Sequence, residues 1–281
     1  MANKHKIFRS GYGNQAFELD CNNDAAYDLA SFLFSDLPGI KAGEQAERYD
    51  IIAAGPLPMW SLWQGEKQLY YGKSRYQVAY ILMNEVIFHC INRNAQQHAL
   101  HAGAVSKGDI CFILPGQSGN GKSTLTAWLV SNGYRYLTDE LILLSHNGQV
   151  LPLTRPISLK VNETHNTWLV PEINTAQCIS SDLGSMIPHR LLNPDFSVQQ
   201  PYVTHIIFPE FKAGTEAIFQ EISPAQSCLR LLQSHVNARN LKGHGISEIT
   251  TIVKQCKSYK LTYSSFDDLE MIFRSSTSIF P

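Results

Sequence analysis

A glycine-rich loop between an apolar segment and a helix-forming segment constrains this chain more than any other feature. Residues 110–115 form an apolar run that ends in proline. The loop that follows matches G-x-x-x-x-G-K-[ST], in which Gly116 and Gly121 are the two glycines. Lys122 and Ser123 complete the pattern. The glycines let consecutive backbone N–H groups turn towards one anion, and the positive end of the next helix points at the same anion. The stretch therefore predicts a strand, a phosphate-binding P-loop and a helix.

The flanking residues favour this interpretation over a glycine-rich turn that binds nothing. Leu125, Trp128 and Leu129 recur at the helical spacing i, i+3, i+4, and Asn132-Gly133 marks a helix end. In such a loop the lysine reaches the β- and γ-phosphates and the hydroxyl binds Mg²⁺. We therefore expect ATP and Mg²⁺ as cofactors, although no base-recognition motif distinguishes ATP from GTP. Nucleotide contacts are expected from Gly116, Gln117, Ser118, Gly119, Asn120, Gly121, Lys122, Ser123 and Thr124.

The composition excludes several classes of partner. A hydrophobic content of 44% with 17% charged residues is typical of a packed globular chain. The formal net charge of −1 provides no basic field, so we expect neither nucleic acid nor a membrane as partner. Six cysteines without a C-x-x-C pair indicate free thiols. Because no signal-like or membrane-spanning apolar segment is present, we expect a cytoplasmic protein, and a homo-oligomer stays open.

The pattern of apolar residues divides the chain into two parts. Residues 1–95 are expected to form a small α+β module, in which 24–34 and 75–95 are helices and the remainder is mainly short strands. This module is a candidate for partner or substrate recognition. Residues 98–281 are expected to form the nucleotide-binding domain, with a further helix at 163–169.

The strands around the loop predict an unusual sheet for a nucleotide-binding protein. Residues 99–105 turn at Lys107-Gly108-Asp109 into the strand that feeds the loop, so the two form a hairpin. A further strand, 134–138, is followed directly by another at 141–144. Such close neighbours do not suit a parallel sheet, in which long crossovers separate the strands. We therefore expect an α/β fold with a mixed, antiparallel-rich sheet.

Two carboxylates, Asp139 and Glu140, separate these last two strands. A kinase needs one carboxylate on Mg²⁺ and another that orients or deprotonates the acceptor hydroxyl. We assign Asp139 to the acceptor and Glu140 to the metal, and the reverse division stays open. The alternative is an acidic pair that only begins a turn.

Four more residues are candidates for the same site. His101 lies one hairpin before the loop, where it would pair with a carboxylate or contact the γ-phosphate, unless it is a buried structural histidine. Glu210, at the end of an apolar strand, is an alternative metal carboxylate. Arg155 and Lys160 would contact phosphate or the acceptor, or lie on a solvated strand edge.

Together these residues resemble the catalytic domain of HPr serine kinases, and most closely an HPr-kinase-related group whose genes often lie among peptide-modification genes. The resemblance rests on His101, the loop 116–124, the segment 133–137 and the pair Asp139-Glu140. It covers residues 98–161 and extends loosely to about 240. It implies a P-loop core similar to phosphoenolpyruvate carboxykinase and ATP-dependent transfer to a serine hydroxyl. It also implies roles for His101, Lys122, Ser123 and Asp139.

The chain departs from that family in three places. HPr kinases carry an Asp-Asp pair where this chain has Asp139-Glu140. Their Leu-Glu-Ile-Arg-Gly-like signature, linked to phosphorylase activity, is missing here, and the N-terminal module differs from theirs. Dephosphorylation, HPr as substrate and a hexamer are therefore not part of the prediction.

The predicted function is Mg-ATP-dependent phosphoryl transfer to a hydroxyl, most simply a serine of a peptide or small protein. Asp139, His101 and Lys122 are the predicted catalytic residues, and Ser123 and Glu140 the metal ligands. Two alternatives stay open: a small-molecule kinase acting on a metabolite or sugar hydroxyl, and a nucleotide-responsive binding module without catalysis.

Overall fold

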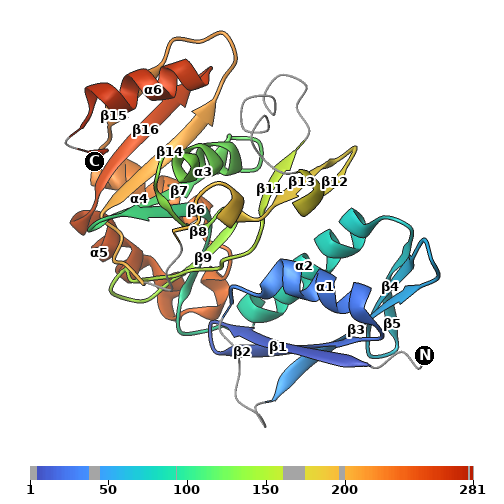
Figure 1. Ribbon diagram of the computed structural model, residues 1–281. Coiled ribbons are helices and arrows are strands. Elements are labelled where there is room, and N and C mark those ends of the chain that lie inside the picture. Colours follow the sequence, from blue (N-terminus) through green and yellow to red (C-terminus); the bar gives the residue numbers. More distant parts are fainter. Residues whose placement is uncertain are drawn as a thin grey trace. The chain divides into compact units, whose positions relative to one another are not determined.

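The structure is a computed structural model that describes residues 5–37, 45–92, 94–160, 175–195, 200–277 and 279–280. The chain divides into two compact units, shown in Figure 1. The first unit combines Met1–Asn94 with Thr154–Leu191, and the second combines Ala95–Leu153 with Leu192–Pro281. The helix expected at 163–169 lies outside the described residues.

The first unit is built on a five-stranded sheet with two helices on one face (Figure 1). Both helices contact the sheet and each other. The alternating burial along β2 explains why the helices cover one face only. Phe17 and Leu19 are buried on that face. Glu18 and Asp20 are partly exposed on the other face, where Glu18 pairs with Arg9. Only β2 and β3 pair in parallel. The elements are β1 (Lys6–Tyr12), β2 (Gln15–Cys21), α1 (Asp24–Phe34), β3 (Ala46–Ala54), β4 (Met59–Gln64), β5 (Lys67–Gly72) and α2 (Arg75–Asn92).

The segment 154–191, which the expected division placed in the second domain, groups with the first unit. It forms a small antiparallel sheet of β11 (Ile157–Lys160), β13 (Gly184–Ile187) and β12 (Ile179–Ser181), and β12 contacts α2. Two short 3₁₀ helices, Thr175–Gln177 and His189–Leu191, belong to the same segment.

Asp36, just after α1, is the main polar anchor of this segment. Its carbonyl accepts a hydrogen bond from the Thr154 hydroxyl at 2.8 Å. Its carboxylate accepts hydrogen bonds from His189 Nε2 at 2.8 Å and from Arg190 Nη2 at 2.7 Å. Burial opposes ionisation of Asp36, but the hydrogen bonds from His189 and Arg190 outweigh it and lower the pKa to about 2. The anchor is therefore ionised at any pH near neutrality.

The second unit contains an eight-stranded mixed sheet in the order β10-β9-β6-β7-β14-β16-β15, with β8 also paired to β6. β7 pairs in parallel with β14, and β14 in parallel with β16, whereas the other described pairings are antiparallel. The expected mixed, antiparallel-rich α/β architecture is confirmed. The strands are β6 (His98–Lys107), β7 (Ile110–Pro115), β8 (Arg135–Thr138), β9 (Leu141–Leu144), β10 (Val150–Leu151), β14 (His205–Phe211), β15 (Ile218–Glu221) and β16 (Lys257–Tyr263).

Helices flank this sheet. α3 (Lys122–Ser131) contacts β6, β7 and β8, and α6 (Phe266–Ser275) contacts β16. The rings of Trp128 and Phe273, 4.8 Å apart, join α3 to α6. α4 (Pro224–Gln233) and α5 (Ile246–Gln255) contact each other and β16. A Cβ on Gly103 in β6 would lie 2.4 Å from Thr126 Oγ1, so this glycine allows α3 its close approach to the sheet. A short 3₁₀ helix covers Ala238–Asn240, and Lys242–Gly245 form turns in which Gly243 and His244 have positive φ angles.

None of the helices in the described part of the chain is long and apolar enough to cross a membrane.

A buried histidine, His98, begins β6. Its side chain is fully buried, and among the described residues neither ring nitrogen has a hydrogen-bond partner. The rings of His235 and His146 lie 5.2 and 5.6 Å away. Burial, reinforced by these two histidines and only weakly opposed by Glu248, lowers the pKa of His98 to about 4. His98 is therefore neutral in the folded protein at pH 7.

This histidine should make the stability of the second unit sensitive to acid. The unfolded chain protonates His98 near its usual pKa of 6.5, whereas the folded chain does so only near 4. The free energy of unfolding is therefore unaffected by His98 above pH 6.5. It falls by about 3 kcal/mol between pH 6.5 and pH 4, because the unfolded chain binds the proton more tightly. Urea unfolding of wild type and His98→Leu, at pH 6.5 and at pH 4, measures this fall in the free energy of unfolding. The fall should be about 3 kcal/mol smaller in the variant, and equal falls would contradict the assignment.

Candidate functional site

The glycine loop that follows β7 has the conformation that its sequence demands. Gly119 and Gly121 have φ angles of 93° and 82°, in the left-handed region that favours glycine. A Cβ on Gly121 would also lie 2.4 Å from the Tyr263 hydroxyl oxygen. That hydroxyl donates to the Gly121 carbonyl at 3.1 Å, and the Phe211 N–H donates to the Asn120 carbonyl at 3.3 Å. The ends of β14 and β16 therefore hold the loop in place.

The start of α3 is arranged to receive an anion. Gly121 occupies the N-cap position and has no side chain to cap the first turn, as in helix N-termini that bind anions. The Lys122 side chain is only 5% exposed, and its ammonium donates to the Gln117 carbonyl at 2.9 Å. The ammonium is therefore held over the loop, where a phosphate oxygen could replace the carbonyl as its acceptor. Glycine conformation, open helix end and lysine together fit a nucleotide phosphate group.

The sheet brings the acidic pair to the same edge as the loop. Ala102 in β6 lies opposite Pro115 on one side, and its N–H donates to the Glu140 carbonyl at 3.1 Å on the other. Since neighbouring strands are about 4.8 Å apart, the backbones of Pro115 and Glu140 are roughly 10 Å apart. His101, the residue before Ala102, places Nε2 2.7 Å from Glu140 Oε1. His101 and Glu140 are thus in direct polar contact beside the loop.

The two acids differ sharply in their surroundings. Asp139 follows the buried strand β8, is itself 0% exposed, and its Oδ1 accepts a hydrogen bond from the Tyr136 hydroxyl at 3.1 Å. The Glu140 side chain is 42% exposed and that of His101 is 30% exposed. Only the His101–Glu140 pair is therefore open to a molecule that arrives from solvent.

A pocket of about 280 Å³ adjoins the loop. Its walls are the first half of the loop, the carboxyl ends of β14 and the neighbouring part of β16, and α4 with the residue that follows it. Glu210 lies in this wall, and its Oε2 is 3.0 Å from Lys260 Nζ. The hydrogen bond from Lys260 is the main cause that lowers the pKa of Glu210, so this carboxylate is ionised and paired.

Four residues of this region were not foreseen from the sequence: Phe211 and Tyr263, which hold the loop, and Arg230 and Lys260, which line the pocket. The proximity of Phe211, Tyr263 and Lys260 to the loop follows from the parallel pairing of β7, β14 and β16, because the carboxyl ends of parallel strands meet at one sheet edge. No local sequence pattern reports which distant strands are neighbours.

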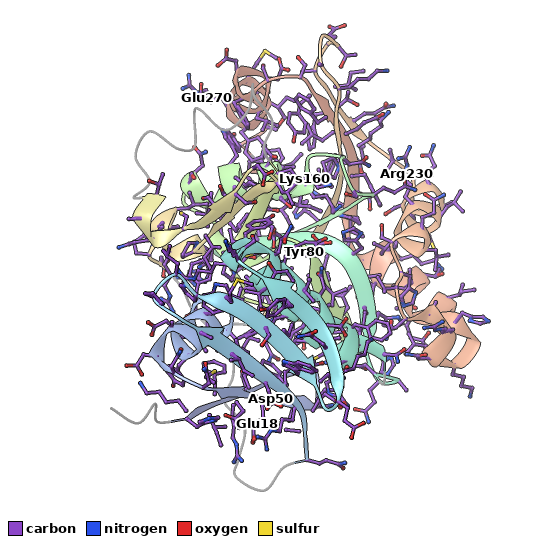
Figure 2. All side chains as sticks on the ribbon, turned by 90° about the vertical axis from the view of Figure 1, so that its right-hand side faces the viewer. Glu18, Asp50, Tyr80, Lys160, Arg230 and Glu270 are labelled. Carbon is purple, nitrogen blue, oxygen red and sulfur yellow. The ribbon has the colours of Figure 1, made fainter. Side chains whose placement is uncertain are left out.

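Arg155 and Lys160 belong to the first unit, not to the unit that carries the loop. Arg155 is 2% exposed, and its Nη1 lies 2.7 Å from Met83 Sδ and 3.3 Å from Ser158 Oγ. Lys160 is exposed at the end of β11, as Figure 2 shows. Their contact with phosphate or acceptor stays a prediction.

Within the described ranges, no group of three or more His, Cys, Asp or Glu side chains is arranged to hold a metal ion. The ligands expected here, one hydroxyl and one carboxylate, are the sparse set typical of Mg²⁺ that is bound largely through phosphates and water. A nucleotide would therefore have to complete the site.

No protein-family model matches the chain, and no curated protein matches it. One similar solved structure is that of the HPr(Ser) kinase/phosphatase from Coxiella burnetii, at 13% sequence identity and a TM-score of 0.34. The match covers 64% of this chain and 93% of the other. A likeness this distant carries no argument about function, which rests on the geometry of the site.

Proposed function

We propose that this protein is a kinase that transfers the γ-phosphoryl group of Mg-ATP to a hydroxyl, most simply that of a serine in a peptide or small protein. One observation carries the proposal. Ala102 lies between the strand that enters the phosphate loop and Glu140, and the preceding residue, His101, pairs with Glu140. A phosphate cradle and a solvent-accessible base are thus adjacent.

The phosphate side of the reaction would be electrostatic. The loop amides, the N-terminus of α3 and the Lys122 ammonium would bind the β- and γ-phosphates and stabilise the charge that develops on them. Ser123 and a carboxylate would hold Mg²⁺, which when bound neutralises phosphate charge. These groups are fixed before substrate arrives, because Tyr263 and Phe211 hold the loop.

The burial of the two acids favours the reverse of the expected assignment, in which Asp139 acts on the acceptor and Glu140 binds the metal. Asp139, at the end of a buried strand, has the setting of the metal-binding aspartate in P-loop enzymes. Glu140 is the accessible acid, and His101 orients it. We therefore assign Asp139 to Mg²⁺ together with Ser123, and Glu140 to the acceptor hydroxyl.

The transfer step then balances as follows. The acceptor oxygen forms a bond to the γ-phosphorus while the bond from that phosphorus to the β,γ-bridging oxygen breaks. ADP leaves with the bonding electrons, and the hydroxyl proton passes to the Glu140 carboxylate. Positioning and charge stabilisation supply most of the rate.

The pocket of about 280 Å³ beside the loop favours a second candidate, a small-molecule hydroxyl as acceptor. Labelled ATP distinguishes the candidates. The full chain is incubated with γ-³²P-ATP, Mg²⁺ and a cell extract, and labelled products are separated by size. Label in peptides supports the first candidate, and label in metabolites the second. Nucleotide binding without any labelled product would replace both with a binding module.

A further inference from the structure

The pocket beside the loop is lined by more positive than negative charge. Arg230, Lys260 and Glu210 are its charged side chains. Lys260 is paired with Glu210 at 3.0 Å, so these two charges offset each other. Arg230 has no such partner among the described residues: its guanidinium carbon lies 5.8 Å from the centre of the Phe208 ring. One positive charge is therefore left for a ligand.

The contact with Phe208 favours a position of the Arg230 side chain beside this pocket. Arg230 projects from α4, as Figure 2 shows, and the Phe208 ring beneath its guanidinium is only 6% exposed. A cation–π contact with the ring favours this position of the guanidinium and does not use its N–H donors, which can bind a carboxylate in a bidentate way. Arg230 itself is exposed, so the contact with Phe208 reduces the conformational entropy that its side chain would lose on binding.

The same pocket is linked to the partner of the proposed base through one backbone hydrogen bond. Ser234, another lining residue, accepts a hydrogen bond at its carbonyl from the His101 N–H at 2.8 Å. Gly116 and Gln117 of the phosphate loop also line the pocket. A ligand in the pocket would thus contact both the phosphate loop and the residue that is hydrogen-bonded to His101.

The volume limits what the pocket holds. At about 30 Å³ for each water-sized group, 280 Å³ takes roughly nine non-hydrogen atoms. That matches a small hydroxy acid or one amino-acid residue with its carboxylate, whereas a nucleoside has about twice as many non-hydrogen atoms. The pocket therefore has room for a small acceptor with a carboxylate.

From these observations we infer that the pocket binds the acceptor, and that the acceptor carries a carboxylate close to its hydroxyl, with Arg230 holding that carboxylate. The inference rests on the proposed kinase function and adds the chemical class of its second substrate. The carboxylate belongs either to a small hydroxy acid or to an acidic residue beside a serine. In both cases Arg230 also offsets the repulsion between that carboxylate and the γ-phosphate.

Binding of defined probes tests the inference. The full chain, loaded with Mg²⁺ and a non-hydrolysable ATP analogue, is titrated calorimetrically with glycerate, malate and free serine. Two serine peptides, one flanked by aspartates and one by lysines, are titrated as well, and glycerol is the neutral reference. The variants are Arg230→Gln and Arg230→Lys, with Arg274→Gln as the matched control. Arg274 is an exposed arginine on α6 that pairs only with Glu270 in the same helix.

We expect at least one carboxylate probe to bind at least tenfold more tightly than its uncharged or basic counterpart. Arg230→Gln should lower the affinity for that probe about tenfold, and Arg230→Lys should retain part of the affinity that Arg230→Gln loses. Arg274→Gln should leave the affinity unchanged. Whether a hydroxy acid or the acidic peptide binds identifies the source of the carboxylate. The inference is overturned if no carboxylate probe binds more tightly than its reference. It is also overturned if Arg230→Gln lowers the affinity for the ATP analogue and not for the carboxylate probe. Failure of the ATP analogue to bind at all would contradict the kinase proposal itself.

Discussion

Replacing Lys122 with alanine is expected to lower phosphoryl transfer by about 10²- to 10³-fold, the usual effect of removing one fixed charge-stabilising donor. The Lys122 ammonium is already held over the loop by the Gln117 carbonyl, so little rearrangement precedes its contact with phosphate. The variant should also bind the ATP analogue more weakly. Initial rates of ADP formation and calorimetric titration measure the two effects.

Lys254→Ala is the matched control, because Lys254 is an exposed lysine near the end of α5. It should leave both quantities unchanged. Loss of the Lys122 hydrogen bond should cost only about 1 kcal/mol of stability, so Lys122→Ala stays folded and its thermal unfolding checks this. Equal rates in wild type and Lys122→Ala would remove the loop from the mechanism.

Replacing Glu140 with glutamine is expected to lower kcat by roughly 10²- to 10⁴-fold, the range for loss of a general base. The amide keeps the shape of the side chain and a contact to His101 but cannot accept the hydroxyl proton. Affinity for the ATP analogue should stay within about twofold, because Glu140 does not contribute to the phosphate cradle. Stopped single-turnover reactions and nucleotide titration separate these two quantities.

Asp139→Asn provides the contrast. If Asp139 is the metal ligand, the variant should require more Mg²⁺ for half-maximal rate, and added Mg²⁺ should recover part of the activity. Glu270→Gln, an exposed glutamate on α6, is the neutral control. The assignment is reversed if Glu140→Gln shifts the Mg²⁺ requirement while Asp139→Asn loses kcat at every Mg²⁺ concentration.

The loop, the hairpin and the acidic pair were predictable from the sequence because each depends on residues close together in the chain. The strand at 110–115, the glycines at 116 and 121 and the strand at 99–105 carry their own turn and pairing signals. The mixed sheet followed from the short connections between these strands. Local patterns therefore predicted the part of the site that we propose to bind phosphate.

The pocket residues and the different burial of the two acids depend on pairings between strands that are distant in the sequence. Glu210 and Lys260 meet because β14 and β16 are parallel neighbours in the sheet. The burial of Asp139 depends on how β8 pairs with β6, whose register shifts between Ala104 and Val105. Two adjacent acids therefore looked interchangeable in the sequence, although one is buried and the other exposed.

Mass spectrometry of serine-containing peptides co-expressed with the full chain tests the kinase proposal most directly. We predict that at least one peptide gains the mass of one phosphate on a serine, and that the gain disappears with Lys122→Ala and with Glu140→Gln. A phosphate gain that persists in both variants would contradict the proposed site. If neither a peptide nor a metabolite gains phosphate while the purified chain binds the ATP analogue, the proposed phosphoryl transfer is wrong.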